Sequence, residues 1–189
     1  MKPTTLDALL LFLVSNKGQS GYDVRQLFQS TPVGLFSDSP GAIYPALARL
    51  ETRGLLASAA EPDGRRRRVY EQTDEGQAAL RRWLTAPIDP GLVERRPQEL
   101  DLRFVMIAEM LGRAQALAYL RAYAGVVEAR HARVLAFHNG PGAAMSQASR
   151  EAVELGIGLG QARLDWLRRM LSNSGEIDDE DALSRRPGA

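Results

Sequence analysis

The stretch SPGAIYPALARLE, residues 39–51, decides the fold of the N-terminal half. A serine followed by a proline is a strong helix start, so this stretch predicts a helix that runs to Arg53. Its large apolar side chains recur four and then three residues apart, which places them on one buried stripe: Ile43, Leu47 and Leu50. Pro45 removes a backbone donor, so either the regular helix begins just before it or the helix bends there.

The segments on either side of this helix complete the pattern of a winged helix-turn-helix. Two helices precede it, over residues 6–17 and 20–29, and each begins with the spacing of a capping box. Two short strands follow it, over residues 55–59 and 65–72, around a Pro-Asp-Gly turn that predicts a hairpin. A capped helix over residues 74–85 closes the unit. In such a module the third helix enters the major groove of DNA, and the hairpin, called the wing, lies against the phosphate backbone.

The face of the third helix opposite the buried stripe is the predicted DNA-reading surface. It presents Tyr44, Pro45, Ala48, Arg49 and Thr52. We expect the Arg49 guanidinium to reach a guanine or a phosphate, and the Tyr44 hydroxyl to donate to a phosphate oxygen. Two serines at the helix entry, Ser37 and Ser39, are expected to meet the DNA backbone. Taken alone, the periodicity also fits an ordinary amphipathic helix with a solvated outer face.

Four consecutive arginines occupy the predicted wing: Arg65, Arg66, Arg67 and Arg68. Folding alone does not explain such a run, because neighbours along a strand point to opposite faces and like charges repel. Phosphates of DNA would relieve this repulsion. A lone charge run is more often simply solvated, but a position directly behind a helix-turn-helix pattern favours DNA binding.

The composition narrows the classes of function. The chain has 189 residues, no cysteine and a net charge of +1, so any DNA contact must come from locally clustered charge. The lack of cysteine excludes thiolate catalysis and cysteine-based zinc sites, and it is compatible with a cytoplasmic location. The sequence carries neither a catalytic motif nor a membrane-length apolar run, so we expect neither an enzyme nor a membrane partner. We expect no cofactor either, since His131 and His138 without a carboxylate cluster make a weak metal site.

The C-terminal half predicts a helical dimerisation domain. Residues 86–97 hold three prolines and a glycine, as a linker does, and helices are expected over residues 98–111, 113–137 and 143–171. Residues 172–189 are polar and acidic, which predicts a disordered tail. The expected fold class is mainly α, with a winged helix-turn-helix that has a two-stranded wing over residues 1–85 and a multi-helix domain over residues 98–171.

Apolar residues on the last two predicted helices recur with coiled-coil-like spacing. The set consists of Leu120, Val127, Val153, Ile157, Gly160, Leu164, Leu167 and Leu171. Two antiparallel helices of one chain would bury such stripes against each other, and a second chain would bury them as well. We expect both uses, and therefore a homodimer.

A pocket for a small-molecule effector is a further hypothesis for this half. The candidate lining residues are Trp83, Phe104, Met106, Met110 and Trp166. The alternative is that they pack in a core or an interface, where methionine often fills gaps.

Several short motifs in the N-terminal half share one known pattern. They are SPGAIYPAL from Ser39, RLE from Arg49, GLL from Gly54, Gly21-Tyr22, Gly64-Arg65, Tyr70 and Thr73 with Glu75-Gly76. Together they cover roughly residues 6–85 and resemble the signature of the PadR-type regulators. The resemblance implies a dimeric, ligand- or stress-responsive regulator, usually a repressor, that contacts DNA through the helix bearing Tyr44 and Arg49 and through the wing. Tyr22 and Tyr70 join the candidate DNA contacts.

Some positions depart from the pattern of that family: Ser20, Ala48, Arg66, Val69 and Gln72. Ala48 stands where a lysine is frequent, and Arg66 replaces a common proline, so we expect the extra wing arginine to compensate for the missing lysine. The predicted function is sequence-specific binding of double-stranded DNA by a homodimeric repressor that a small molecule releases. The alternative is a winged helix used only as a protein-interaction module, which would show a flat response to salt.

Overall fold

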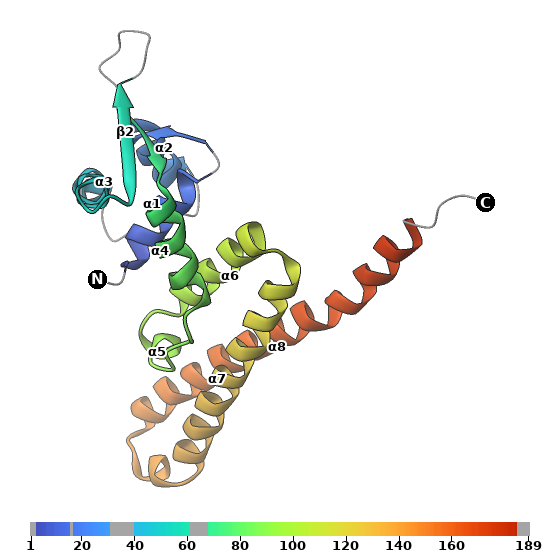
Figure 1. The fold of residues 1–189 in the computed structure, drawn as a ribbon. Helices are drawn as coiled ribbons and strands as arrows, with labels where there is room; N and C mark the ends of the chain where they lie inside the picture. Colours follow the sequence, from blue (N-terminus) through green and yellow to red (C-terminus); the bar gives the residue numbers. More distant parts are fainter. Residues whose placement is uncertain (1–2, 16, 31–39, 61–67, 185–189) are drawn as a thin grey trace. The chain divides into compact units, whose positions relative to one another are not determined.

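The computed structural model describes residues 3–15, 17–30, 40–60 and 68–184, and the chain divides into two compact units (Figure 1). The first unit ends at Pro87 and the second begins at Ile88. Each unit has its own set of fully buried apolar side chains. Helices make up most of both units, as expected for a mainly α chain, and the first unit also holds a small antiparallel sheet.

The first unit has the predicted order of a winged helix-turn-helix (Figure 1). It consists of α1 (Thr5–Leu13), β1 (Gln19–Ser20), α2 (Gly21–Ser30), the 3-10 helix η2 (Pro40–Ala42), α3 (Ile43–Thr52), β2 (Leu56–Ala60), β3 (Arg68–Gln72) and α4 (Asp74–Thr85). The strands are antiparallel in the order β1-β3-β2, so the second wing strand lies in the middle of the sheet. Strand β1 was not expected, because two residues carry no alternation that a sequence pattern can detect.

Polar side chains cap the first two helices as their spacing predicts. The Asp7 N–H donates to the Thr4 hydroxyl, and the Thr4 N–H donates back to the Asp7 carboxylate. Ser20 and Asp23 make the same pair of contacts at the start of α2. Both capping boxes satisfy backbone donors that have no partner within the helix, so these helix starts are fixed locally.

The structure shows where α1 ends and where Pro45 lies in α3, and the periodicity of apolar residues predicts neither. Helix α1 ends at Leu13, four residues before its expected end, and the Ser15 hydroxyl donates to the Phe12 carbonyl there (2.8 Å). Helix α3 begins at Ile43, so Pro45 is its third residue, where a missing N–H costs no intrahelical hydrogen bond. Of the two alternatives for Pro45, the helix start just before it is therefore confirmed.

The predicted apolar stripe of α3 is fully buried. Ile43, Leu47 and Leu50 have no solvent exposure. Other buried apolar side chains of this unit come from α1, α2 and α4: Leu9, Leu10, Leu11, Val24, Phe28 and Leu80. Full burial of each large aliphatic side chain contributes about 1.5–3 kcal/mol, so the stripe determines which face of α3 is left for solvent or for a ligand.

Two glycines shape the passage from α3 into the wing and on to α4. Gly54 has a φ of +69°, and the N–H groups of Gly54 and Leu55 donate to the carbonyls of Glu51 and Leu50. This is the Schellman end of a helix, which favours glycine. Gly76, in the first turn of α4, lies directly against the Leu55 carbonyl: a Cβ atom at residue 76 would be 2.1 Å from that oxygen. The glycine therefore allows α4 to approach the start of β2.

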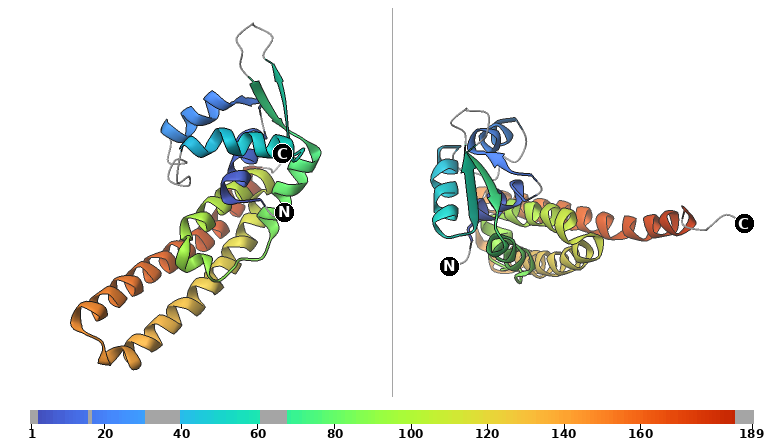
Figure 2. Two further views of the ribbon diagram at one scale, coloured as in Figure 1. Left: turned by 90° about the vertical axis from the view of Figure 1, so that its left-hand side faces the viewer. Right: turned by 45° about the horizontal axis from the view of Figure 1, so that its top comes forward.

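The second unit consists of helices. They are α5 (Leu92–Arg95), α6 (Pro97–Leu111), α7 (Arg113–Asn139), the 3-10 helix η3 (Pro141–Ala144) and α8 (Gln147–Ser184). Figure 2 shows α7 and α8 side by side, with η3 joining them at one end. The long helical hairpin predicted for this half is therefore present.

The expected linker over residues 86–97 is corrected in part. It contains the short helix α5, whose Val93 is buried, and its last residue, Pro97, is the first residue of α6. Proline is common at the first position of a helix because its missing N–H has no partner there. Some of the prolines that indicated a linker therefore begin or precede helices.

The expected disordered tail over residues 172–189 is also corrected. Helix α8 continues to Ser184 instead of ending at residue 171, and residues 185–189 lie outside the described residues. Extending an existing helix by one residue costs far less than starting a new one. No proline stands in this stretch before Pro187, so the sequence contains no strong stop there.

A polar cluster joins the three long helices of the second unit. The Tyr123 hydroxyl on α7 donates to Asp101 of α6 (3.1 Å), and the Arg163 guanidinium on α8 donates to the other Asp101 oxygen (3.2 Å). Burial raises the pKa of the Asp101 carboxyl, and the positive charge of Arg163 lowers it. These directed contacts fix how α7 and α8 lie along α6.

Replacing Gly76 with alanine tests the close approach of α4 to β2. We expect Gly76→Ala to lower the free energy of unfolding by about 1–3 kcal/mol, because the new methyl group overlaps the Leu55 carbonyl. The control is Gly125→Ala on α7, where a Cβ atom meets open space and should raise stability by up to about 1 kcal/mol. Denaturant unfolding of both variants decides, and equal effects would contradict the steric argument.

Candidate nucleic-acid interface

The outer face of α3 is exposed as predicted. Its exposed residues include Tyr44, Pro45, Ala48 and Thr52. Tyr22, at the start of α2, is also exposed, with 54% of its surface accessible. Tyr44 lies over Gly21, since a Cβ atom at residue 21 would be 2.7 Å from the Tyr44 ring. The absence of a side chain at Gly21 thus permits the contact between α2 and α3 and sets the position of Tyr44.

Arg49 lies on the same helix, but its guanidinium contacts the protein. It donates to the carboxylate of Asp7 on α1 (2.5 Å), while 41% of the Arg49 side chain stays exposed. Arg53 lies 3.5 Å from the other Asp7 oxygen. Asp7 is fully buried, and a buried carboxylate needs such partners. In this structure the Arg49 guanidinium thus contacts Asp7, and its contact with a guanine or a phosphate stays a prediction.

A second acidic residue, Glu51, connects α3 to both strands of the wing. Its carboxylate accepts hydrogen bonds from the Ser58 hydroxyl on β2 (2.6 Å) and the Arg68 guanidinium on β3 (2.9 Å). The Arg68 side chain is 62% exposed, so this ion pair contributes little to stability by itself. The Glu51 carboxylate matters more for geometry than for stability. Because it contacts Ser58 of β2 and Arg68 of β3, it positions the wing strands against α3.

The expected DNA contact by Tyr70 is wrong. Tyr70 lies on the central strand β3, opposite Gln19 of β1 and Ser58 of β2, and only 7% of it is exposed. A motif position does not show which face of a strand is buried, and here the ring faces the core. The remaining predicted contacts, Ser37, Ser39, Arg65, Arg66 and Arg67, lie outside the described residues.

The predicted dimerisation stripe packs within the second unit. Leu120, Val127, Leu164 and Leu167 are at most 3% exposed, Gly160 is buried, and Val153, Ile157 and Leu171 are half-buried. A Cβ atom at Gly160 would lie 2.8 Å from the His131 ring of α7, so this glycine allows α7 and α8 to meet. The stripe therefore packs within one chain, as predicted. Its use by a second chain stays a prediction, for which the half-buried Val153, Ile157 and Leu171 are the exposed members.

A different apolar stripe on α8 is exposed. Leu155 and Leu159 are 66% and 64% exposed, and the exposed residues Ala152 and Ala162 continue the stripe at spacings of three. Positions 152, 155, 159 and 162 thus repeat at three, four and three residues, the spacing of a helix–helix contact. Gly158 beside them has open space around its Cβ position. We call these four residues the outer stripe.

The five residues predicted to line an effector pocket are divided between the two units. Trp83 belongs to the first unit, whereas Phe104 and Trp166 of the second pack edge to face with ring centres 5.9 Å apart. Met106 is fully buried and Met110 is half-buried. Phe104 lines a pocket in the second unit, together with Ala108, Arg113, Ala116, Leu117, Leu120, Met170 and Asn173. Met106 is thus a core residue, as the alternative interpretation expected.

Two residues of this site were not predicted, Asp7 and Glu51. Asp7 had a complete local explanation as the partner of Thr4 in a capping box, and Glu51 formed part of a motif without a role of its own. The feature of the sequence that could have revealed both residues is their negative charge, which lies beside the predicted DNA-facing surface. Such a charge repels phosphate unless a neighbouring cation neutralises it, and three arginines do so here: Arg49, Arg53 and Arg68.

Among the described residues, no group of three or more histidine, cysteine, aspartate or glutamate side chains is placed to hold a metal ion. His138 instead lies 3.7 Å from Glu154. Within the same residues, none of the helices combines the length and the apolar character needed to cross a bilayer.

Comparison with known proteins relates the first unit to one protein family. Residues 10–82 match the family described as "Transcriptional regulator PadR-like family". That family consists of DNA-binding regulators and not of enzymes. A curated relative, "Transcriptional regulator Rv3488" of Mycobacterium tuberculosis, is 58% identical over 43 residues. That stretch is 22% of this chain, and it spans 40% of the length of the relative.

Solved structures similar to most of this chain include three from two Bacillus species. PadR of Bacillus subtilis in complex with operator DNA is 22% identical, with a TM-score of 0.42, over 89% of this chain and 98% of that one. The same protein in complex with p-coumaric acid is 20% identical, with a TM-score of 0.40, over 89% and 94%. The PadR-like regulator BC1756 of Bacillus cereus is 19% identical, with a TM-score of 0.39, over 89% and 96%.

Replacing Asp7 with asparagine tests the anchoring of α3. We expect Asp7→Asn to lower the free energy of unfolding by about 2–4 kcal/mol, since Arg49 and Arg53 lose their shared counter-charge; the partial exposure of Arg49 keeps the loss below that of a fully buried pair. Asp74→Asn, at the exposed start of α4, is the control and should cost about 0.5 kcal/mol. Urea denaturation measures both, and a loss no larger than that of the control would refute the anchoring role.

Proposed function

We propose that the protein, whose residues 10–82 match the PadR-like family of transcriptional regulators, is a sequence-specific regulator that binds double-stranded DNA as a homodimer. The resemblance further implies a repressor that a small molecule releases. A regulator of this kind acts where the DNA is, so we propose a cytoplasmic location. The observation that carries the proposal is the exposed face of α3, fixed beside the wing through Glu51.

The chemistry of the exposed face supports contact with a DNA groove. Tyr44 and Tyr22 offer hydroxyl groups to phosphate oxygens. The Thr52 hydroxyl already donates to the Ala48 carbonyl of α3 (2.9 Å). Pro45 and Ala48 present small apolar surfaces, which suit contact with thymine methyl groups. The face contains no acidic residue, so the backbone of DNA can approach it without repulsion.

The wing supplies the positive charge in this proposal. Arg65, Arg66 and Arg67 precede Arg68, whose guanidinium contacts Glu51. Because the base of the wing is tied to α3, the arginines beyond it would meet the phosphates beside the groove that α3 enters. This arrangement separates the two tasks: α3 contacts bases, and the wing contacts backbone.

The outer stripe of α8 supports the homodimer. A single winged helix reads a short half-site, and a dimer supplies a second one at a fixed spacing. Leu155 and Leu159 are large, apolar and well exposed, and alanines flank them in helical register. A second copy of α8 could bury the same stripe symmetrically, which is how most homodimers associate.

The wing arginines make DNA binding sensitive to salt. If each subunit of the dimer neutralises about three phosphates, affinity should fall roughly 10³-fold between about 50 and 200 mM salt. Replacing Arg66 and Arg67 with alanine should lower the slope of log affinity against log salt by about one for each phosphate that the variant no longer neutralises. Arg68 is kept because it contacts Glu51.

Fluorescence anisotropy on a DNA fragment selected by footprinting of the full chain measures these slopes. The control carries Arg121→Ala and Arg133→Ala, two exposed arginines of α7, and should keep the original slope. An unmodified chain whose affinity is flat against salt would indicate a winged helix used for protein interaction instead.

Charges placed on the outer stripe should separate the subunits. We expect Leu155→Asp with Leu159→Asp to convert a particle of twice the chain mass of 20.7 kDa into a monomer, because two carboxylates from each subunit would meet in the interface. Val105→Asp on α6, at another exposed apolar position (49% exposed), is the control and should stay dimeric. Sedimentation velocity reports the masses; a dimer that survives the double substitution would exclude this surface.

A further inference from the structure

The contact between Arg49 and Asp7 leaves most of the Arg49 guanidinium available. Arg49 donates from Nη2 to one Asp7 oxygen, and within the described part of the chain its side chain makes no other hydrogen bond, ion pair or ring contact. A guanidinium has five N–H donors in one plane. Each Nη2 hydrogen belongs to a different edge with two parallel donors, so one bond from Nη2 leaves the other edge complete. Arg49 can therefore hold Asp7 and still offer a pair of donors to a ligand.

Arg49 lies at the border of the exposed face of α3. It follows Pro45 by four residues and precedes Thr52 by three, so it shares one side of the helix with both. Its side chain stays 41% exposed while it contacts Asp7. Within Ile43–Thr52 it is the one cationic residue. In the major groove guanine presents two acceptors, O6 and N7, which one edge of an arginine matches.

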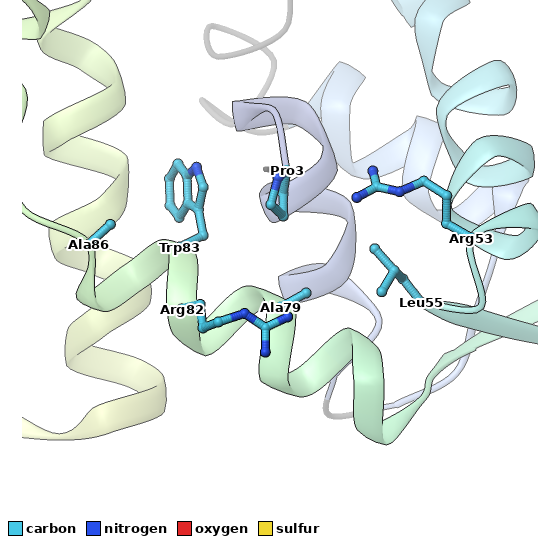
Figure 3. Close-up of a pocket in the computed structure, with 7 residues that line it drawn as sticks. All are labelled: Pro3, Arg53, Leu55, Ala79, Arg82, Trp83 and Ala86. Carbon is cyan, nitrogen blue, oxygen red and sulfur yellow. The ribbon is translucent and has the colours of Figure 1, made fainter. Parts of the chain in front are cut away.

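Arg53 contacts the same carboxylate from the side of the core. It lies 3.5 Å from the other Asp7 oxygen and is 22% exposed. It lines a pocket together with Pro3, Leu55 and Trp83, among others, and Figure 3 shows its guanidinium extending from the end of α3 toward Pro3. Leu55 and Trp83 are at most 8% exposed, so Arg53 lies among buried side chains. Of these two arginines, Arg49 is thus the one beside the exposed face.

A guanidinium that is held in one orientation suits a contact that depends on direction. A phosphate attracts a cation from many directions, whereas a guanine requires two donors aligned with its O6 and N7. A long side chain also loses rotamer freedom when a ligand fixes it. Asp7 removes part of that freedom before any ligand binds, which lowers the cost of a directional contact.

We propose that Asp7 is a positioning residue for base recognition, because it presents one edge of Arg49 to O6 and N7 of a guanine in the major groove. Asp7 itself is buried and acts through Arg49. The inference rests on the proposed DNA-binding function, and it adds a base contact to the hydroxyl and apolar groups of the exposed face.

Replacing guanines of the operator with 7-deazaguanine tests this contact, because the analogue has a carbon in place of N7 and keeps O6. The operator is found by footprinting of the full chain and is then made with one guanine replaced at a time. At one guanine of the half-site the replacement should lower the affinity, measured by fluorescence anisotropy, about tenfold. Arg49→Gln should reduce this ratio of affinities to less than about twofold. Arg81→Gln, at an exposed position on α4, is the control and should leave it unchanged.

The same ratio separates positioning from folding. If Asp7 only stabilised the fold, Asp7→Asn would lower binding to both DNAs equally and keep the ratio at about tenfold. Positioning predicts a ratio of about threefold or less. Asp7→Glu keeps the charge and moves the carboxylate by one methylene, so it should reduce the ratio as well and serves if Asp7→Asn does not fold.

The outcomes distinguish this inference from the proposed function. The inference is overturned if no guanine of the half-site responds to the replacement, or if the ratio survives in Arg49→Gln or in the Asp7 variants. In each of these cases the chain still binds DNA and the proposed function stands. A chain that binds no double-stranded DNA would refute the proposed function, and this inference with it.

Discussion

A single buried carboxylate organises the DNA-binding unit. Asp7 has no exposure to solvent, so its charge has to be balanced inside the protein. It accepts a hydrogen bond from the Thr4 backbone of its own helix and contacts Arg49 and Arg53 of α3. The apolar stripe of α3 is attracted to the core without a preferred direction. The charged contacts are directional, so they decide how far α3 is rotated and where it lies along α1.

Glu51 holds α3 from a second side. Asp7 and Glu51 together determine which face of α3 stays exposed and available to DNA. Glu51 fixes the base of the wing through Ser58 and Arg68, and Asp7 fixes the helix on the core. Neither has to form when DNA arrives, so binding does not carry the entropic cost of ordering α3 against β2 and β3. In the proposed function, base reading then depends on hydroxyl and apolar groups, and the phosphates are left to the arginines of the wing.

Rules that use residues a few positions apart predicted the fold. They missed contacts in which a residue also binds a partner far away in the sequence. The stripe from Ile43 to Leu50 and both capping boxes follow from spacing alone, because each depends on residues a few positions apart. Arg49 was placed on the correct face, but its contact with Asp7 joins residues 42 positions apart, which periodicity cannot reveal. The coiled-coil-like spacing on α8 raised a related ambiguity: the helix has two apolar stripes, and the sequence does not tell which of them meets α7.

The outer stripe bears on how the proposed homodimer would form. In the outer stripe two alanines flank two leucines, so the apolar surface that it offers to a second subunit is small. DNA with two half-sites would raise the effective concentration of one subunit near the other, which favours the dimer on DNA over the dimer in solution. A change that weakens the contact of α3 with DNA acts in each subunit of the proposed dimer, and independent changes in binding free energy add. Their effects on affinity therefore multiply: a tenfold loss per half-site, about 1.4 kcal/mol, becomes about a hundredfold loss for the dimer.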